Sequence, residues 1–97
     1  MNTRHFQKIA AALLEKHYGI GLGDTSLHDE TVVADCIRDG YRPYQVVAEH
    51  AREADLDRID LQGAYGVPSK AEITATDEAA VIRQMAPRRR SLGLGLG

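Results

Sequence analysis

The sequence predicts a small all-α domain, and three observations support this. The chain has 97 residues and 43% apolar residues, which suits one hydrophobic core. Apolar residues recur at the three-and-four spacing of amphipathic helices in several segments. Glycine or proline stands between these segments, where helices begin or end. We therefore expect a compact bundle of about four helices over residues 1–87, followed by a disordered tail at residues 88–97.

The first helix is expected over residues 3–17. Its apolar face consists of Phe6, Ile9, Ala10, Leu13 and Leu14. Gly19 can supply the left-handed residue that ends this helix, because glycine adopts positive φ without steric cost. Residues 19–24 carry three glycines and predict a flexible loop, anchored to the core by Ile20 and Leu22.

A second helix is expected to begin near Thr25 or Asp29, since either side chain can accept a hydrogen bond from a free amide group. Gly40 should end it. Its apolar face consists of Leu27, Val32, Val33, Cys36 and Ile37. The connection to the next helix is short, which predicts that the two helices are neighbours in space.

The third helix should start at Pro43, because the first turn of a helix does not need the amide hydrogen that proline lacks. We expect it to extend to Ala54, with its buried face formed by Tyr44, Val47, Ala48 and Ala51.

A loop rich in glycine and proline is expected at residues 61–68, before the last helix. Ser69 and Thr74 each begin a capping pattern, with an acid three residues later, so the fourth helix can start from either one. Pro87 should close it. Ile73 and its threonine neighbours could instead form a short extended piece.

The sequence predicts no metal site, no cofactor and no catalytic residue. His50 and Glu53 share a helix face, but no second histidine has a fixed relation to them. Asp55 and Asp57 alternate as in a calcium loop, yet the required glycine and closing glutamate are missing. Cys36 falls on an apolar helix face, which predicts a buried and unreactive thiol.

Two segments have the composition of a binding surface. The turn before the third helix combines tyrosine and arginine, side chains that often dominate protein interfaces. The segment 55–60 places three acids and one arginine between two aliphatic residues, so it cannot be wholly core. The residues predicted to bind a partner are Tyr41, Arg42, Asp55, Asp57, Arg58 and Asp60.

No apolar run is long enough to cross a membrane, and residues 2–8 lack the layout of a secretory signal. A single cysteine suits a reducing compartment. We therefore expect a cytoplasmic protein that does not contact a membrane.

Several short phrases are similar to those of a known group of proteins. They are His17-Tyr18-Gly19, Asp24-Thr25, Arg42-Pro43-Tyr44, Asp55-Leu56-Asp57-Arg58-Ile59-Asp60 and Gly66-Val67-Pro68-Ser69. The group comprises small accessory proteins of plasmids and integrative elements, of toxin–antitoxin or anti-defence type. The resemblance covers roughly residues 3–85 and implies partners in host defence or stability systems. It assigns no catalytic residue.

The main functional prediction is a non-catalytic binding module that inhibits a host protein or ribonucleoprotein complex, as anti-CRISPR and antirestriction inhibitors do. The first alternative is a toxin with ribonuclease-type activity, using His50 or His17 with Arg42 and Tyr44. The second is a helix-turn-helix regulator. Specific DNA binding is disfavoured, because the third helix presents acids that would repel phosphates.

Overall fold

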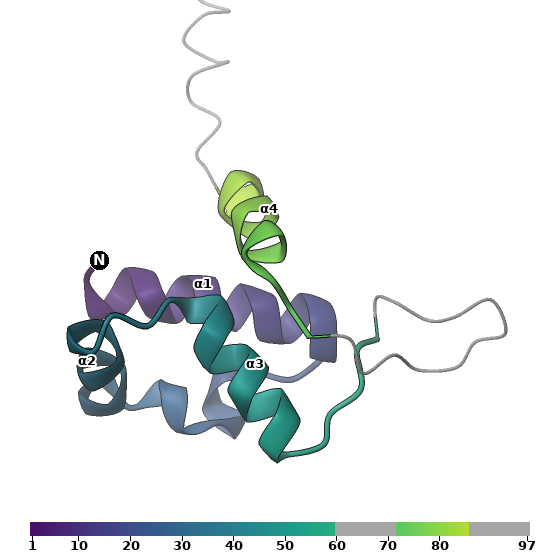
Figure 1. Cartoon of the computed structure of the whole chain (residues 1–97), viewed down its shortest axis with the longest axis horizontal. Coiled ribbons are helices and arrows are strands. Elements are labelled where there is room, and N and C mark those ends of the chain that lie inside the picture. Colours follow the sequence, from purple (N-terminus) through teal and green to yellow (C-terminus); the bar gives the residue numbers. More distant parts are fainter. Residues whose placement is uncertain (60–71, 86–97) are drawn as a thin grey trace, which may run out of the picture.

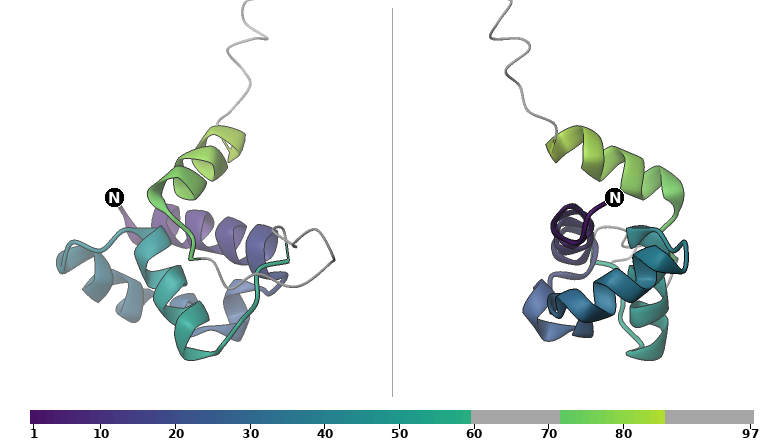
Figure 2. Two further views of the ribbon diagram at one scale, coloured as in Figure 1. Left: turned by 45° about the vertical axis from the view of Figure 1, so that its right-hand side comes forward. Right: turned by 90° about the vertical axis from the view of Figure 1, so that its left-hand side faces the viewer.

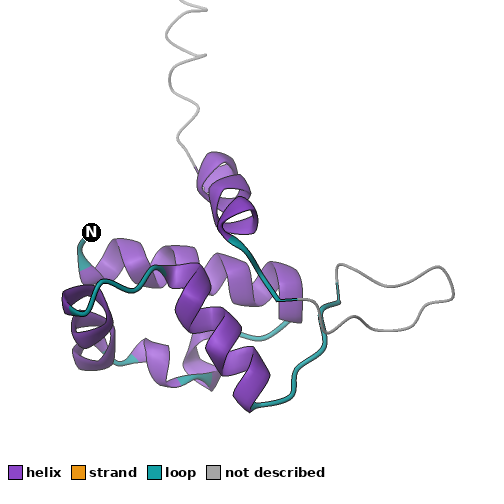
Figure 3. Cartoon of the chain, in the orientation of Figure 1, coloured by secondary structure: helices purple, strands orange, loops and turns teal. Residues whose placement is uncertain are grey.

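The computed structural model describes residues 1–59 and 72–85, which form four α-helices and no strand (Figures 1 and 3). The helices are α1 (Thr3–Tyr18), α2 (Glu30–Arg38), α3 (Pro43–Glu53) and α4 (Ala75–Met85). Two short 3₁₀-helices, Leu22–Asp24 and Ser26–His28, lie between α1 and α2. The predicted all-α class is confirmed. The expected loop at residues 61–68, the alternative helix start at Ser69 and the tail at residues 88–97 lie outside the described residues.

α1 is the central helix, because it contacts each of the other three (Figures 1 and 2). α3 crosses it and also contacts α4. The predicted apolar face of α1 is fully buried, and burial of such side chains is the main force that holds the bundle together. The buried apolar residues are Phe6, Ile9, Ala10, Leu13, Leu14, Tyr18, Leu27, Val33, Val47, Ala48, Ala51, Ile73 and Val81.

Three helices end with a residue of positive φ, and two of these residues are the predicted glycines. Gly19 has φ +70° after α1, and Gly40 has φ +84° after α2. The third is Asp55, with φ +55° after α3. The amide of the following residue, Leu56, donates to the carbonyl of Ala51 at 2.9 Å, as a Schellman helix end requires. Asp55 therefore ends a helix, a role that its place in an acidic segment does not reveal.

The segment between α1 and α2 differs from the predicted flexible loop, because side chains fold it into two 3₁₀ turns. The carboxylate of Asp24 accepts from the amide of Gly21 at 3.1 Å. The hydroxyl of Thr25 accepts from the amide of Leu27 at 3.0 Å, and Leu27 enters the core. Thr25 thus caps the second 3₁₀ turn, whereas Asp29 caps α2 by accepting from the amide of Thr31 at 2.8 Å.

The second of the two predicted capping patterns starts α4. The carboxylate of Asp77 accepts from the amide of Thr74 at 2.9 Å. Ile73, just before the helix, is buried without belonging to a strand or helix. Glu78 and Val81 face the interior, so this helix buries a carboxylate as well as an aliphatic side chain.

Candidate functional site

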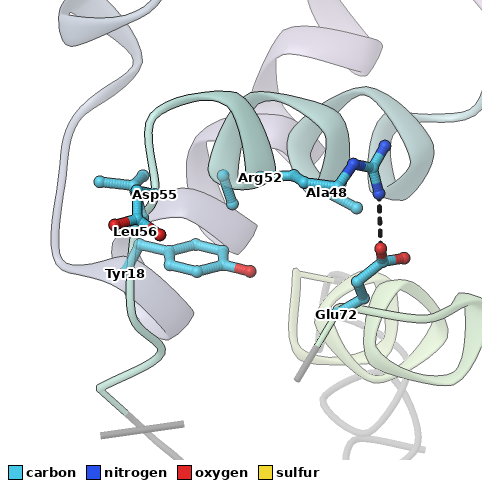
Figure 4. Close-up of a pocket in the computed structure, with 7 residues that line it drawn as sticks. Tyr18, Ala48, Arg52, Asp55, Leu56 and Glu72 are labelled. Atoms are coloured by element: carbon cyan, nitrogen blue, oxygen red, sulfur yellow. Dashed lines mark hydrogen bonds and ion pairs between the residues drawn. The ribbon is translucent and has the colours of Figure 1, made fainter. Parts of the chain in front are cut away.

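A pocket of about 170 Å³ opens where the ends of α1 and α3 meet the residue preceding Ile73 (Figure 4). We call it the α3 pocket, and its lining residues are Tyr18, Ala48, Ala51, Arg52, Asp55, Leu56 and Glu72. The members from α3 and its end recur at three- and four-residue spacing, so they share one helix face. Two of them are alanines, whose small side chains leave the space unfilled.

The α3 pocket has an apolar floor and a charged rim. The ring of Tyr18 starts beside Asp55 and Leu56 and extends along α3 in the direction of Glu72 (Figure 4). At the rim, the guanidinium of Arg52 donates to the carboxylate of Glu72, and both side chains are 58% exposed. An ion pair this exposed contributes about 0.5 kcal/mol, so it can open when a partner arrives.

A second arginine, Arg58, follows α3 and has a side chain that is only 3% exposed. Its Nη2 donates to Nδ1 of His17 at 3.0 Å, and its Nη1 lies 3.5 Å from Oδ2 of Asp77. The backbone carbonyl of Glu72 accepts from the same Nη1 at 3.4 Å. A guanidinium only donates, so Nδ1 of His17 carries no proton here. We call Arg58, His17 and Asp77 the Arg58 cluster. It ties the segment after α3 to both α1 and α4.

The start of α3 is held by Glu78, a buried carboxylate of α4. One oxygen accepts from the amide of Tyr44 at 2.9 Å, and the other accepts from Nε of Arg42 at 3.0 Å and from its Nη2. Arg42 is half-exposed, and Tyr41 beside it is exposed. The carboxylate thus supplies an acceptor to a free helix amide and a counter-charge to the arginine.

The six predicted binding residues do not form one surface. Tyr41 and Arg42 precede α3, whereas Asp55 and Asp57 are exposed beyond its other end. The 11 residues of α3 separate the two groups, which is about 16 Å along the helix axis. Arg58 is buried and faces the core. Asp60 lies outside the described residues.

The predicted ribonuclease set is also not brought together. His17 contacts Arg58 in the interior, and Arg42 contacts Glu78. His50 lies eight residues after Arg42, about 12 Å further along α3. These side chains therefore cannot act on one phosphate group in this arrangement.

Of the seven lining residues, only Asp55 is among the predicted binding residues, and the sequence pattern did not single out Tyr18, Arg52 or Glu72. Tyr18 and Glu72 come from outside α3, so only the fold reveals that they meet. The spacing of Ala48, Ala51, Arg52 and Asp55 was the one available signal, since it places two small and two charged residues on one helix face.

The remaining reactive group is the thiol of Cys36. Its pKa is raised, first by burial and then by the nearby carboxylates of Asp35, Asp39 and Glu49. The thiol is therefore protonated and weakly nucleophilic at neutral pH. Within residues 1–59 and 72–85, no group of three or more histidine, cysteine or acidic side chains is arranged to hold a metal ion.

A comparison with known protein families assigns the chain to one of them. The model of the CbtA toxin family, from a type IV toxin–antitoxin system, matches residues 4–79. The chain belongs to this toxin family. The matched range contains α1 except its first residue, α2, α3, the start of α4 and every residue of the α3 pocket. No solved structure matches the chain.

The family match corrects the main functional prediction. The prediction of an anti-CRISPR or antirestriction inhibitor is wrong, because the matched family is a toxin family. The predicted resemblance to toxin–antitoxin accessory proteins is confirmed, and the toxin alternative fits the match. Ribonuclease activity is not part of what the match shows. Toxins of type IV toxin–antitoxin systems act on proteins of the host.

None of the helices in the described part of the chain combines the length and hydrophobicity that a membrane crossing requires.

Proposed function

We propose that this toxin acts by binding and occupying a host protein, without catalysing a reaction. The family match carries the proposal, because it assigns the chain to toxins that act on host targets. The contacts support the non-catalytic part. His17 and Arg42, two of the residues considered for phosphate chemistry, are engaged by Arg58 and by the buried Glu78.

The surface beyond the end of α3 is the proposed contact region. Asp55 and Asp57 are exposed there, and Glu53 in the last turn of α3 adds a third carboxylate. Carboxylates grouped in this way attract a basic patch on a partner and speed its association. The target is therefore a host protein that presents lysine or arginine side chains.

The first experiment expresses the toxin at controlled levels and compares growth with the amount of its target. We expect growth to stop while cellular RNA stays intact. We also expect a tagged toxin to recover one host protein in roughly equimolar amount, and overproduction of that protein to restore growth. A catalyst would instead act at amounts far below those of its target. Degradation of RNA by the purified toxin, or growth arrest that ignores the dose of the target, would overturn the proposal.

A charge variant tests the contact region. Asp55→Gly with Asp57→Lys removes the acids while glycine keeps the positive φ of the helix end. Asp35→Asn with Asp39→Lys is the matched control, because it makes the same charge change on exposed acids in and just after α2. We expect the first variant to bind the recovered protein at least tenfold more weakly, with unchanged helicity, and the control to bind normally. Equal binding by both variants would place the contact elsewhere.

A further inference from the structure

We propose that the α3 pocket is the subsite that receives one apolar anchor side chain of the host protein, next to a lysine or arginine of that protein. The inference rests on the proposed function, because it specifies which part of the toxin meets the target and what chemistry is recognised.

The size and lining of the pocket match an anchor side chain. Its volume of about 170 Å³ is close to that of apolar cavities that hold a benzene-sized molecule, about 150 Å³. The floor is formed by Ala48, Ala51, Leu56 and the ring of Tyr18. Full burial of a leucine or phenylalanine side chain at such a site strengthens binding roughly tenfold to hundredfold. Interfaces commonly concentrate their affinity in one such filled pocket.

The rim of the α3 pocket selects the charge beside the anchor. It carries one arginine, Arg52, and two carboxylates, Asp55 and Glu72. Figure 4 shows the two carboxylates on opposite sides of the Tyr18 ring. A side chain inserted into the pocket would therefore have one carboxylate on each side. Because Glu72 also accepts from Arg52 through a weak exposed pair, a lysine of the partner can compete for it.

The same features disfavour nucleic acid as the occupant. An apolar floor offers a base little hydrogen bonding, and the rim together with Asp57 repels phosphate groups. The charge complementarity therefore points to a protein segment that alternates basic and apolar residues.

A peptide titration tests the pocket without the target. The probe is acetyl-Lys-Phe-Lys-amide, added to isotope-labelled toxin while backbone amide resonances are recorded. We expect shift changes centred on Ala48, Ala51, Arg52 and Leu56. Acetyl-Lys-Ala-Lys-amide should bind at least tenfold more weakly, because it lacks the anchor. Acetyl-Glu-Phe-Glu-amide should also bind more weakly, because its charges oppose the rim. Equal affinities for the three peptides, or shift changes elsewhere, would overturn the inference.

Two variants test the pocket against the target itself. Ala48→Leu fills the pocket from within, and Ala34→Leu is the control on an exposed face of α2. We expect Ala48→Leu to bind the host protein at least tenfold more weakly and the control to bind normally. Glu72→Lys is a second variant at an exposed position, so it preserves the core. It should reverse the peptide preference from the basic to the acidic probe.

The outcomes separate this inference from the function on which it rests. If wild-type toxin binds its target and Ala48→Leu binds equally well, the pocket inference fails and the proposed function stands. If no host protein is bound, the proposed function fails. The peptide titration alone then decides whether the pocket binds an apolar side chain next to a basic one. If Ala48→Leu instead dissociates a dimer of the toxin in sedimentation measurements, the occupant is a second copy and the inference is overturned.

Discussion

One ion pair joins the start of α3 to α4, and another joins the segment beyond its end to α4. The two pairs differ in which member is buried: the acid in the first and the arginine in the second. At the start, Glu78 is 5% exposed while its partner Arg42 is 49% exposed. Beyond the end, Arg58 is 3% exposed while its partner Asp77 is 25% exposed. The two acids are consecutive in α4, so one turn of this helix holds both ends of its neighbour. The comparison teaches that the cost of removing one member of an ion pair depends on whether water can take its place beside the groups that remain.

The same comparison separates buried charges from exposed ones. Arg58 and Glu78 are the buried members: Arg58 contacts groups from α1 and from the residues before and within α4, and Glu78 accepts hydrogen bonds from two residues at the start of α3. Arg52 and Asp55, at the rim of the α3 pocket, are exposed. Substitution of the first pair should therefore change stability, whereas substitution of the second pair should change binding.

The largest effect is expected for Arg58→Ala. The change leaves Nδ1 of His17 and the carbonyl of Glu72 without this donor, and it leaves Asp77 without its counter-charge. Removal of one partner from a buried pair costs roughly 3–5 kcal/mol of the free energy of unfolding. Urea denaturation followed by circular dichroism measures this loss. Arg83→Ala, at an exposed position of α4, is the control and should change stability by less than about 0.5 kcal/mol. A loss below about 1 kcal/mol for Arg58→Ala would show that the Arg58 cluster does not hold the fold.

A smaller effect is expected for Glu78. Glu78→Ala leaves the amide of Tyr44 and the guanidinium of Arg42 without their acceptor, which should cost about 2 kcal/mol. Glu78→Gln keeps a carbonyl oxygen for the amide and should recover about half of that loss. The same urea measurement compares the two variants. If they are equally unstable, the charge of Glu78 matters and its hydrogen bond to the amide does not.

Arg42→Ala should have the smallest effect on stability of these three sites. Because the arginine is half-exposed, solvent screens the pair and the expected loss is about 1 kcal/mol. The loss should shrink further when salt is raised to about 1 M, whereas the loss for the buried Arg58 should not. Unfolding curves at low and high salt check this difference. The comparison between the two ends breaks down if both variants respond equally to salt.

Most of the fold was predictable because it depends on local patterns. The spacing of the apolar residues of α1, the glycines at 19 and 40, and Pro43 at the start of α3 each gave the correct element. The failure at residues 19–24 has a local cause as well. Three glycines suggested flexibility, but Asp24 and Thr25 supply acceptors that fold the segment into turns.

The candidate site was less predictable because it depends on contacts between distant residues. Arg58 and Asp77 are 19 positions apart, and nothing near either one shows that they form a pair. The acidic segment suggested that its arginine binds a partner, whereas the fold turns it inward. Asp55 directly follows the predicted end of the third helix, yet its positive φ was not anticipated, because glycine is the usual residue there.

The last prediction concerns Cys36, which is connected to the start of α3. The amide of Tyr41 donates to the carbonyl of Cys36 at 2.9 Å, so the end of α2 is joined to the turn that holds Arg42. Arg42→Ala should loosen this turn and raise the rate of alkylation of Cys36 about twofold. Arg52→Ala removes a comparably exposed arginine from the other end of α3 and should leave the rate unchanged.

The pH dependence of Cys36 alkylation is the control for this rate measurement. Because burial and the neighbouring carboxylates raise the pKa of Cys36, alkylation of the folded protein should become fast only at a higher pH than alkylation of the urea-unfolded chain. The direction in which pH changes the folding stability follows from the protons bound by the folded and unfolded chains. Between the lower pKa of the unfolded chain and the raised pKa of the fold, only the unfolded chain loses the proton, so folding stability should fall as pH rises. If Arg42→Ala and Arg52→Ala accelerate alkylation equally, the two ends of α3 do not open independently.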